Sequence, residues 1–187
     1  MGNFKKCAAV LAFLFLPVGV CSVASAQEVA PGQTEAVGFI GGVTDGGGFT
    51  MGGGLHYAVN SRWLFDSELA YLTGGNDVQG VVQGFGVGIE SSAMSVDLNA
   101  HYLFPQSTNR NFTPYVLGGL GLLRVSASTA FFGVRTSVSD TQAGLNIGAG
   151  LRWQTGGNWG VRPEMKVLVA DNSSVRFSTG LYYQFGR

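Results

Sequence analysis

The sequence predicts an all-β protein, an eight-stranded antiparallel up-and-down transmembrane β-barrel, and three observations lead to this fold class. Apolar and polar residues alternate in eight segments separated by turn residues, which is typical of strands with two unlike faces. Large aromatic side chains recur at one end of these segments. The other face of these segments carries charged side chains, which are rarely buried in a packed core without a partner of opposite charge.

Residues 1–26 are predicted to be a secretory signal peptide that is removed on export. Lys5 and Lys6 precede an apolar run, and the small-residue sequence ASA provides a cleavage site after Ala26. Residues 27–187 are then predicted to form a single outer-membrane β-barrel domain.

The composition narrows the class of protein. The chain has 11 basic and 11 acidic residues, and Lys5 and Lys6 are lost with the leader, so no basic surplus points to nucleic acid. Both cysteines, Cys7 and Cys21, also belong to the leader, so disulfides are not expected to stabilise the exported chain. No stretch after the leader reaches about 18 uninterrupted apolar residues, which excludes a transmembrane helix there.

The eight predicted strands are joined by connections of two kinds. Compact turns follow the second, fourth and sixth strands, and short links follow the first and seventh, whereas residues 74–90 and 127–138 are predicted to be long loops. In a chain that meanders up and down, both long loops lie at one end of the barrel. The strands are predicted over residues 34–44, 48–59, 63–73, 91–104, 113–126, 139–154, 159–170 and 174–186.

Among the first four strands only the first is ambiguous, because glycines and apolar residues occupy both of its parities. The second strand alternates between apolar residues such as Leu55 and a polar set that includes His56. The third and fourth strands repeat this pattern, with Phe65 and Leu98 on the apolar parity and acidic residues on the other. Each of these three strands is therefore predicted to have one apolar and one polar face.

The fifth strand is ambiguous in the same way as the first. In the sixth strand Leu145 and Ile147 share one parity and Arg152 lies on the other, and the seventh strand sets Val161 against Arg162. The eighth strand, VRFSTGLYYQF, carries large apolar groups on one parity, although nothing follows it that could cover them. That face is predicted to touch lipid hydrocarbon.

Nine aromatic residues on the apolar parity lie at strand ends beside the compact turns, if the ambiguous fifth strand places Tyr115 on that parity. Because these ends lie at one level, the residues are predicted to form an aromatic ring at a membrane–water interface. In a soluble sandwich, large aromatics would concentrate in mid-strand. The predicted ring comprises Tyr57, Trp63, Tyr102, Phe104, Tyr115, Trp153, Trp159, Tyr183 and Phe185.

The polar parity is predicted to line a narrow lumen. In hydrocarbon every backbone N–H and C=O group must be bonded internally, so the strands must close into a barrel. Eight strands leave an interior just wide enough for side chains, and roughly balanced opposite charges should pair across it and plug it. The predicted polar network of the lumen comprises Asp66, Glu68, Asp97, Arg152, Arg162, Glu164, Lys166 and Arg176.

Two histidines on the same parity, His56 and His101, raise two chemical alternatives. They could bind a metal with Asp97 or Glu68, but the sequence has no His/Cys cluster. Ser95 and His101 could act as nucleophile and base, but six residues along one strand separate them by ~20 Å. The sequence therefore predicts no metal, no cofactor and no enzymatic activity.

A soluble lipocalin-like barrel is the alternative fold. It would place Trp153, Trp159 and Phe185 inside and the charged row of the seventh strand outside. The ring of aromatics at one level favours the membrane barrel over this alternative.

The chain resembles the small eight-stranded outer-membrane barrels, the OmpA-like transmembrane domain and the OmpX and opacity-type proteins of the porin family. The resemblance implies the outer membrane of a Gram-negative bacterium, a monomer in lipid, and delivery by periplasmic chaperones and the barrel-assembly machinery. Gly180, Tyr183 and Phe185 resemble the terminal signal read by that machinery, although Gly186 and Arg187 follow where the family ends on the aromatic. The stretches that carry the resemblance are TPYVLGGLGLL, AGLNIGAGLRW, NWGVRPEMKV and GLYYQF.

The expected function is a structural or surface-interaction role, because loops on a rigid barrel carry function. Residues 74–90 and 127–138 are the expected contact surface. A narrow porin-like channel for small solutes or ions is the alternative, and a lipid-modifying enzyme is a weaker third option.

Overall fold

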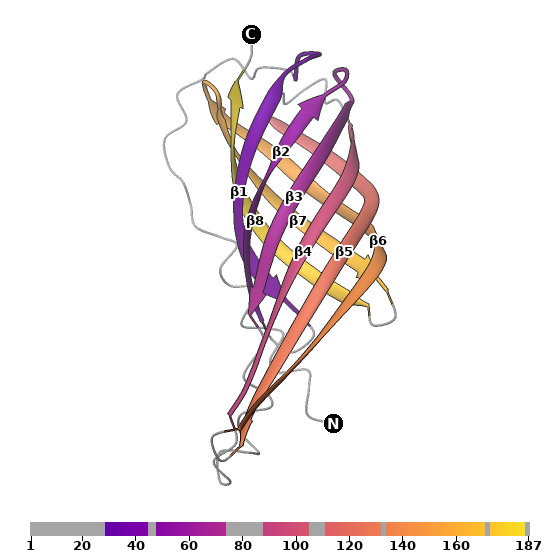
Figure 1. Cartoon of the computed structure of the whole chain (residues 1–187). Coiled ribbons are helices and arrows are strands. Elements are labelled where there is room, and N and C mark those ends of the chain that lie inside the picture. The colour runs from indigo at the N-terminus through magenta and orange to yellow at the C-terminus, as the bar shows by residue number, and fades with distance from the viewer. Residues whose placement is uncertain are drawn as a thin grey trace, which may run out of the picture.

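The computed structural model is a closed barrel of eight strands (Figure 1). It describes residues 29–44, 48–73, 88–104, 111–131, 134–170 and 173–185. Among the residues described, no helix is long and apolar enough to cross a membrane. The strands are β1 (Thr34–Val43), β2 (Phe49–Ala58), β3 (Trp63–Thr73), β4 (Gly88–Leu103), β5 (Phe112–Phe131), β6 (Val134–Gly156), β7 (Trp159–Val169) and β8 (Ser174–Phe185).

Each strand pairs antiparallel with the next, which confirms the predicted up-and-down topology. The barrel closes where β8 pairs with β1, in a register that runs from Thr34 opposite Phe185 to Val43 opposite Arg176. The backbone groups of the two terminal strands are thereby bonded to each other, as a strand in hydrocarbon requires.

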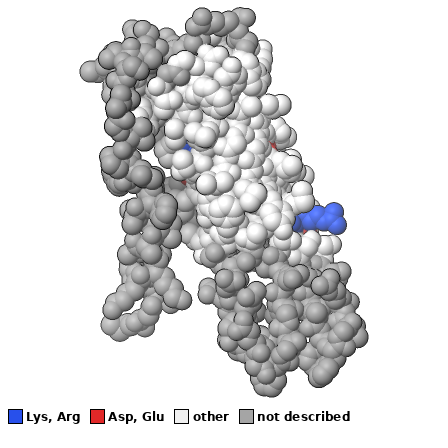
Figure 2. All heavy atoms as spheres, turned by 90° about the vertical axis from the view of Figure 1, so that its left-hand side faces the viewer, with Lys and Arg blue, Asp and Glu red and all other residues white. Residues whose placement is uncertain are grey.

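The two faces of the wall differ in the way that the alternation predicted. Large apolar side chains cover the outside, where Leu120 and Ile40 are 63% and 61% exposed. Buried polar and charged side chains fill the inside. Figure 2 shows one side of the barrel, on which the described surface is almost free of charged residues. This arrangement is the inverse of a water-soluble barrel and suits a wall that contacts lipid.

The predicted loop at residues 127–138 is wrong. β5 continues to Phe131 and β6 begins at Val134, and the two strands stay paired from Ser126 opposite Ser139 to the last pair, Phe131 opposite Val134. β4 reaches Gly88, opposite Ala130, so three strands extend beyond the barrel at the end away from the compact turns (Figure 1).

The physical reason lies in the composition of this stretch. Thr129, Val134, Thr136 and Val138 are β-branched and favour extended backbone, although this stretch lacks the regular apolar–polar alternation by which the other strands were predicted. In the other predicted loop, residues 88–90 belong to β4 and residues 74–87 lie outside the described part of the chain.

Glycines make room for two tyrosines inside the lumen. A Cβ added at Gly150 would collide with the ring and hydroxyl of Tyr115 and lie 2.8 Å from the carbonyl oxygen of Pro163. A Cβ added at Gly160 would collide with the ring of Tyr182 in the same way. Both tyrosines are about 1% exposed, so neither ring can move aside freely.

We therefore expect Gly150→Ala to lower the free energy of unfolding by ~1–3 kcal/mol, the usual cost of overpacking. Urea-induced unfolding in detergent micelles, followed by tryptophan fluorescence, measures the change. Gly38→Ala is the matched control, because a Cβ at Gly38 meets nothing within 4 Å. Equal midpoints for the two variants would contradict the close approach at Gly150.

Candidate functional site

The predicted polar network comes from inward-facing residues of five strands. β3 supplies Asp66 and Glu68, and β4 supplies Asp97. β6 supplies Arg152, alternate residues of β7 supply Arg162, Glu164 and Lys166, and β8 supplies Arg176. The structure buries all eight residues of the predicted network, namely Asp66, Glu68, Asp97, Arg152, Arg162, Glu164, Lys166 and Arg176.

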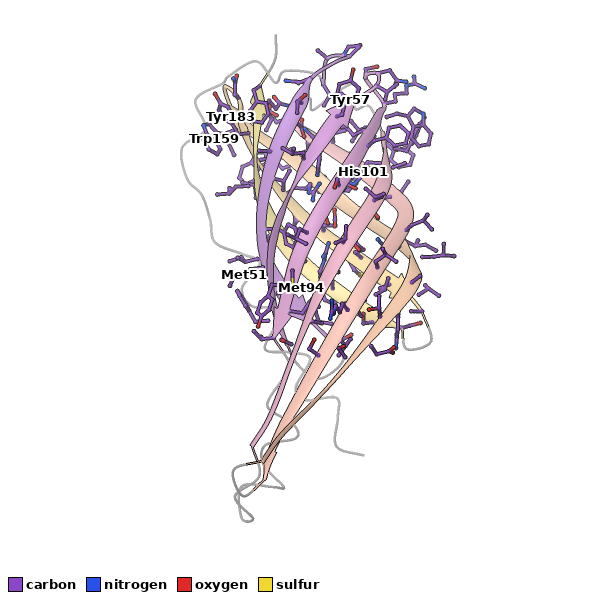
Figure 3. The ribbon with its side chains drawn as sticks, viewed as in Figure 1. Met51, Tyr57, Met94, His101, Trp159 and Tyr183 are labelled. Atoms are coloured by element: carbon purple, nitrogen blue, oxygen red, sulfur yellow. The ribbon has the colours of Figure 1, made fainter. Side chains whose placement is uncertain are left out.

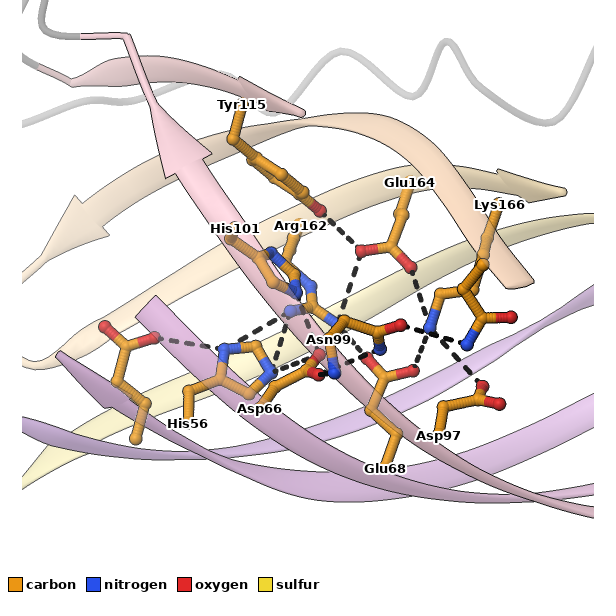
Figure 4. A network of polar contacts seen from close by, with 12 residues as sticks. His56, Asp66, Glu68, Asp97, Asn99, His101, Tyr115, Arg162, Glu164 and Lys166 are labelled. Carbon is orange, nitrogen blue, oxygen red and sulfur yellow. Dashed lines mark hydrogen bonds and ion pairs between the residues drawn. The ribbon is translucent and has the colours of Figure 1, made fainter. Parts of the chain in front are cut away.

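Glu68 lies at the centre of this network and contacts three cations. Its Oε1 accepts a hydrogen bond from Arg162 at 2.6 Å. Its Oε2 accepts from Lys166 Nζ at 2.6 Å and from Arg176 at 2.7 Å. Figure 4 shows Arg162 and Lys166 converging on this carboxylate from β7. One carboxylate therefore holds three positive charges in a buried site, where such pairs are strong.

Two further acids surround the same three cations. Asp97 lies 3.4 Å from Lys166 and 3.5 Å from Arg176. Glu164 lies 3.6 Å from Arg162, 3.8 Å from Lys166 and 3.9 Å from Arg176. The three acids match the three bases in charge, so this layer of the lumen needs no bound ion for neutrality.

Asp66 lies in a separate layer with the two histidines. Its Oδ1 accepts hydrogen bonds of 2.8 Å from the backbone and side-chain nitrogens of Asn99. Its Oδ2 lies 2.8 Å from His101 Nε2, and the His101 ring lies 5.3 Å from that of His56. His56 Nε2 in turn lies 2.8 Å from the guanidinium of Arg162, which links the two layers.

The structure shows the partner of Arg152, which the predicted network did not include. Glu35 of β1 binds Arg152 in a two-pronged pair, with N–O distances of 2.6 and 2.8 Å. Gln184 also donates to Glu35, at 2.9 Å. The ring of Tyr182 lies 4.4 Å below the Arg152 guanidinium. The signal that could have found Glu35 is that it is the only charged residue in its strand.

Tyr115 is a correction to the predicted aromatic ring. It faces the lumen, is 1% exposed and donates a hydrogen bond of 2.8 Å to Glu164. The fifth strand carries apolar residues on both faces, so only the register with its neighbours fixes its parity. That register places Tyr115 opposite Gly150, whose missing side chain leaves the space for the ring.

The other eight residues of the predicted ring lie on the outside of the wall, near the compact turns. Trp63 and Tyr102 pack edge to face with ring centroids 5.1 Å apart, and Trp159 and Tyr183 lie 4.7 Å apart. Phe112, which the prediction omitted, stacks on Trp153 at 5.4 Å. Figure 3 shows Tyr57, Trp159 and Tyr183 at the end of the barrel away from the projecting strands. The outward set comprises Tyr57, Trp63, Tyr102, Phe104, Trp153, Trp159, Tyr183 and Phe185.

The residues of the predicted assembly signal lie on both faces of β8. Gly180 faces the lumen, opposite Phe39 of β1 and Arg162 of β7. Tyr183 and Phe185 face outward, with ring centroids 5.7 Å apart.

The residues considered for metal binding and catalysis are engaged in other contacts. Ligand atoms of His56, Asp66 and Glu68 lie within 4.8 Å of one another. Arg162 contacts both His56 and Glu68, so a metal cation there would meet a positive charge already in place. His101 faces Asp66 rather than Ser95, which lies further along β4 opposite Ala70 and Leu123.

Comparison with known proteins identifies this architecture. Residues 13–185 match the model of the outer membrane protein beta-barrel domain. No curated protein matches the chain. Three solved structures are similar at TM-scores of 0.56–0.59 and identities of 18–20%, a level that supports the fold alone.

The first of these structures is the N-terminal β-barrel domain of Pseudomonas aeruginosa OprF, with a TM-score of 0.57 and 18% identity over 84% of this chain and 100% of that one. The second is Neisserial surface protein A, with a TM-score of 0.59 and 18% identity over 82% and 96%. The third is Ail, the attachment invasion locus protein of Yersinia pestis, with a TM-score of 0.56 and 20% identity over 83% and 99%. Because this family model matches almost the whole length of the chain, the chain belongs to the outer membrane protein β-barrel family.

Proposed function

We propose that this outer-membrane barrel has a structural or surface-interaction role, exercised by the sheet that β4, β5 and β6 build beyond the barrel. One observation carries the proposal: within the described part of the chain, one edge of that sheet pairs with no strand. β6 pairs with β7 only as far as Leu145 opposite Val169. Residues 134–144 of β6 extend further, and no described strand bonds to that edge.

An unpaired edge is a template for another extended chain, since its N–H and C=O groups point outward in a row. Ser139, Asp140 and Thr141 lie on this stretch and are exposed. The partner that fits is an extended peptide segment of another protein that adds a strand to β6. Neisserial surface protein A and the attachment invasion locus protein, both similar in fold, carry names that agree with a role at the cell surface.

The lumen supports a closed scaffold rather than a reaction site or an open passage. Its charged residues are paired with one another, and His101 is bonded to Asp66. On this proposal the chain has no catalytic activity and takes no cofactor.

The remaining parts of the proposal concern export and membrane insertion. Residues 1–26, which lie outside the described part of the chain, are a cleaved signal peptide. Periplasmic chaperones deliver the chain, and the assembly machinery reads Gly180, Tyr183 and Phe185. The outward aromatic residues lie at the periplasmic interface and anchor a monomer in lipid.

A narrow channel is the competing function, because some buried polar atoms of the described side chains make no hydrogen bond. Such atoms are where ordered water binds, and a chain of waters would be the beginning of a conducting path. Among the described side chains these atoms are Thr50 Oγ1, Asn146 Oδ1, Arg162 Nε, Glu164 Oε1 and Arg176 Nε.

Single-channel recording of purified, refolded residues 27–187 in planar bilayers separates the two functions. We expect a folded barrel, shown by a heat-dependent shift in gel migration, without reproducible conductance, because ion pairs fill the lumen. Conductance that changes in Glu164→Ala or Arg162→Ala would favour the channel.

The surface role is tested with cells that carry the full chain or a variant in which residues 127–138 are replaced by a two-residue turn. Retention of the cells on a surface coated with immobilised extended peptides is the measurement. We expect the variant to fall to the level of cells without the protein. Equal retention at equal surface amounts of folded barrel would contradict the role of the projecting sheet.

A further inference from the structure

The segment that precedes β1 folds into the turn-side mouth of the barrel. Val29 is only 7% exposed and Gln33 only 3%, although both lie before the first strand. Val29 belongs to a buried apolar cluster whose other members come from the barrel wall. The cluster comprises Val29, Ala58, Leu64, Leu103, Tyr115 and Leu117.

Hydrogen bonds fix the segment in this position. Gly32 donates to the carbonyl of Ala58 at 2.8 Å, and Ala58 donates to the carbonyl of Gln33 at 2.9 Å. The side chain of Gln33 accepts from Ala30 at 3.0 Å, which closes a small loop within the segment. Gly32 has a φ of 81°, a left-handed conformation that favours glycine, so most other residue types would be strained in this turn.

The apolar cluster adjoins the charged network of the lumen. Tyr115 belongs to both, since its ring is part of the cluster and its hydroxyl donates to Glu164. The ring of His101 also lies 5.1 Å from that of Tyr115. Val29 therefore packs against a cluster that contacts the charged network through Tyr115.

We infer that residues 29–33 are a stopper that closes the turn-side end of the lumen to water and small solutes. The stopper is held by two buried side chains, Val29 and Gln33, and a few hydrogen bonds, whereas the wall is held by eight paired strands. Opening of the segment therefore costs less free energy than unfolding of the barrel, as is usual for weakly held peripheral segments. This inference is independent of the proposed function, since the stopper and the projecting sheet lie at opposite ends of the barrel.

Cysteine labelling tests this inference, because the only two cysteines, Cys7 and Cys21, lie in the predicted leader and residues 27–187 have none. Leu64→Cys places a thiol in the apolar cluster, at a position that is 1% exposed. A negatively charged, membrane-impermeant methanethiosulfonate is the probe, applied to the refolded barrel in micelles. We expect slow labelling with the native segment and labelling faster by roughly 10- to 100-fold when Val29→Asp is added.

Two variants keep the test specific. Gly32→Val should accelerate labelling as Val29→Asp does, because a β-branched residue disfavours the left-handed turn. Val29→Ile should leave the Leu64→Cys thiol protected. Asn60→Cys, in the exposed turn after β2, is the control and should label fast in every background.

Two results would contradict the inference that residues 29–33 close the lumen. One is a Leu64→Cys thiol that labels as fast as Asn60→Cys with the native segment present. Another is unchanged slow labelling in both Val29→Asp and Gly32→Val when gel migration shows a folded barrel. If neither variant folds, the segment is an integral part of the barrel fold and not a closure that can open.

Discussion

Replacing Glu68 with alanine is expected to lower the free energy of unfolding by ~3–5 kcal/mol, because removal of one partner from a buried ion pair leaves its counter-charges uncompensated. The carboxylate lies 2.6–2.7 Å from nitrogens of Arg162, Lys166 and Arg176. Asp97 and Glu164 remain nearby but lie 3.4–3.9 Å from these cations, and only Asp97 accepts a hydrogen bond from one of them, Lys166, at 3.4 Å. Urea-induced unfolding in micelles, followed by tryptophan fluorescence, measures the loss.

Glu68→Gln and Asp140→Ala serve as the two references. Glu68→Gln keeps the shape but loses the charge, so it should also be strongly destabilised. Asp140 is exposed, and its described contact is a 3.1 Å hydrogen bond from Gln142, so Asp140→Ala should change stability by less than ~0.5 kcal/mol. A loss in Glu68→Ala no larger than that in Asp140→Ala would show that the lumen network does not stabilise the barrel.

Placing an arginine at Leu120 is expected to destabilise the inserted barrel by ~2–4 kcal/mol, the cost of a cationic side chain at the middle of the lipid-facing wall. Leu120 is 63% exposed and lies on the outer row of β5. Arg124, four residues along the same row, is also exposed and marks where that row becomes polar. Unfolding from liposomes, rather than from micelles, is the measurement, because the cost depends on depth in a bilayer.

Ser126→Arg is the matched control for Leu120→Arg. Ser126 lies on the same row beyond Arg124 and is exposed, so arginine there should cost ~0–1 kcal/mol, as at an interface. If both arginines cost the same, the outer apolar face does not lie in hydrocarbon, and a soluble barrel would have to be reconsidered.

The faces of β3, β4 and β7 could be predicted from the sequence because, over most of their length, large apolar residues alternate with polar or charged ones. The faces of β1 and β5 could not, since glycines and apolar residues occupy both parities of these strands. Tyr115 shows the consequence: its parity depends on the register with β4 and β6, which alternation does not specify. The same ambiguity concealed Glu35 as the partner of Arg152.

The pairing of charged residues within the lumen also could not be predicted from local sequence patterns. Glu35 and Arg152 are separated by 117 positions, and Glu68 and Arg176 by 108. Which charges meet across the barrel depends on the stagger of the strands, which fixes the level of each side chain. The alternation predicted that charges face inward, and only the three-dimensional register determined the pairs.

The pairing of β1 with β8 has a consequence for how the chain is assembled. Gln184 donates a hydrogen bond to Glu35 across 149 positions, so this seam joins residues that are far apart in the sequence. It cannot form before the last strand has been delivered. A slip of one residue at the seam would turn Glu35 from the lumen towards lipid and separate it from Arg152. The buried pair therefore favours closure in the native register, because only a Glu35 that faces the lumen can contact Arg152.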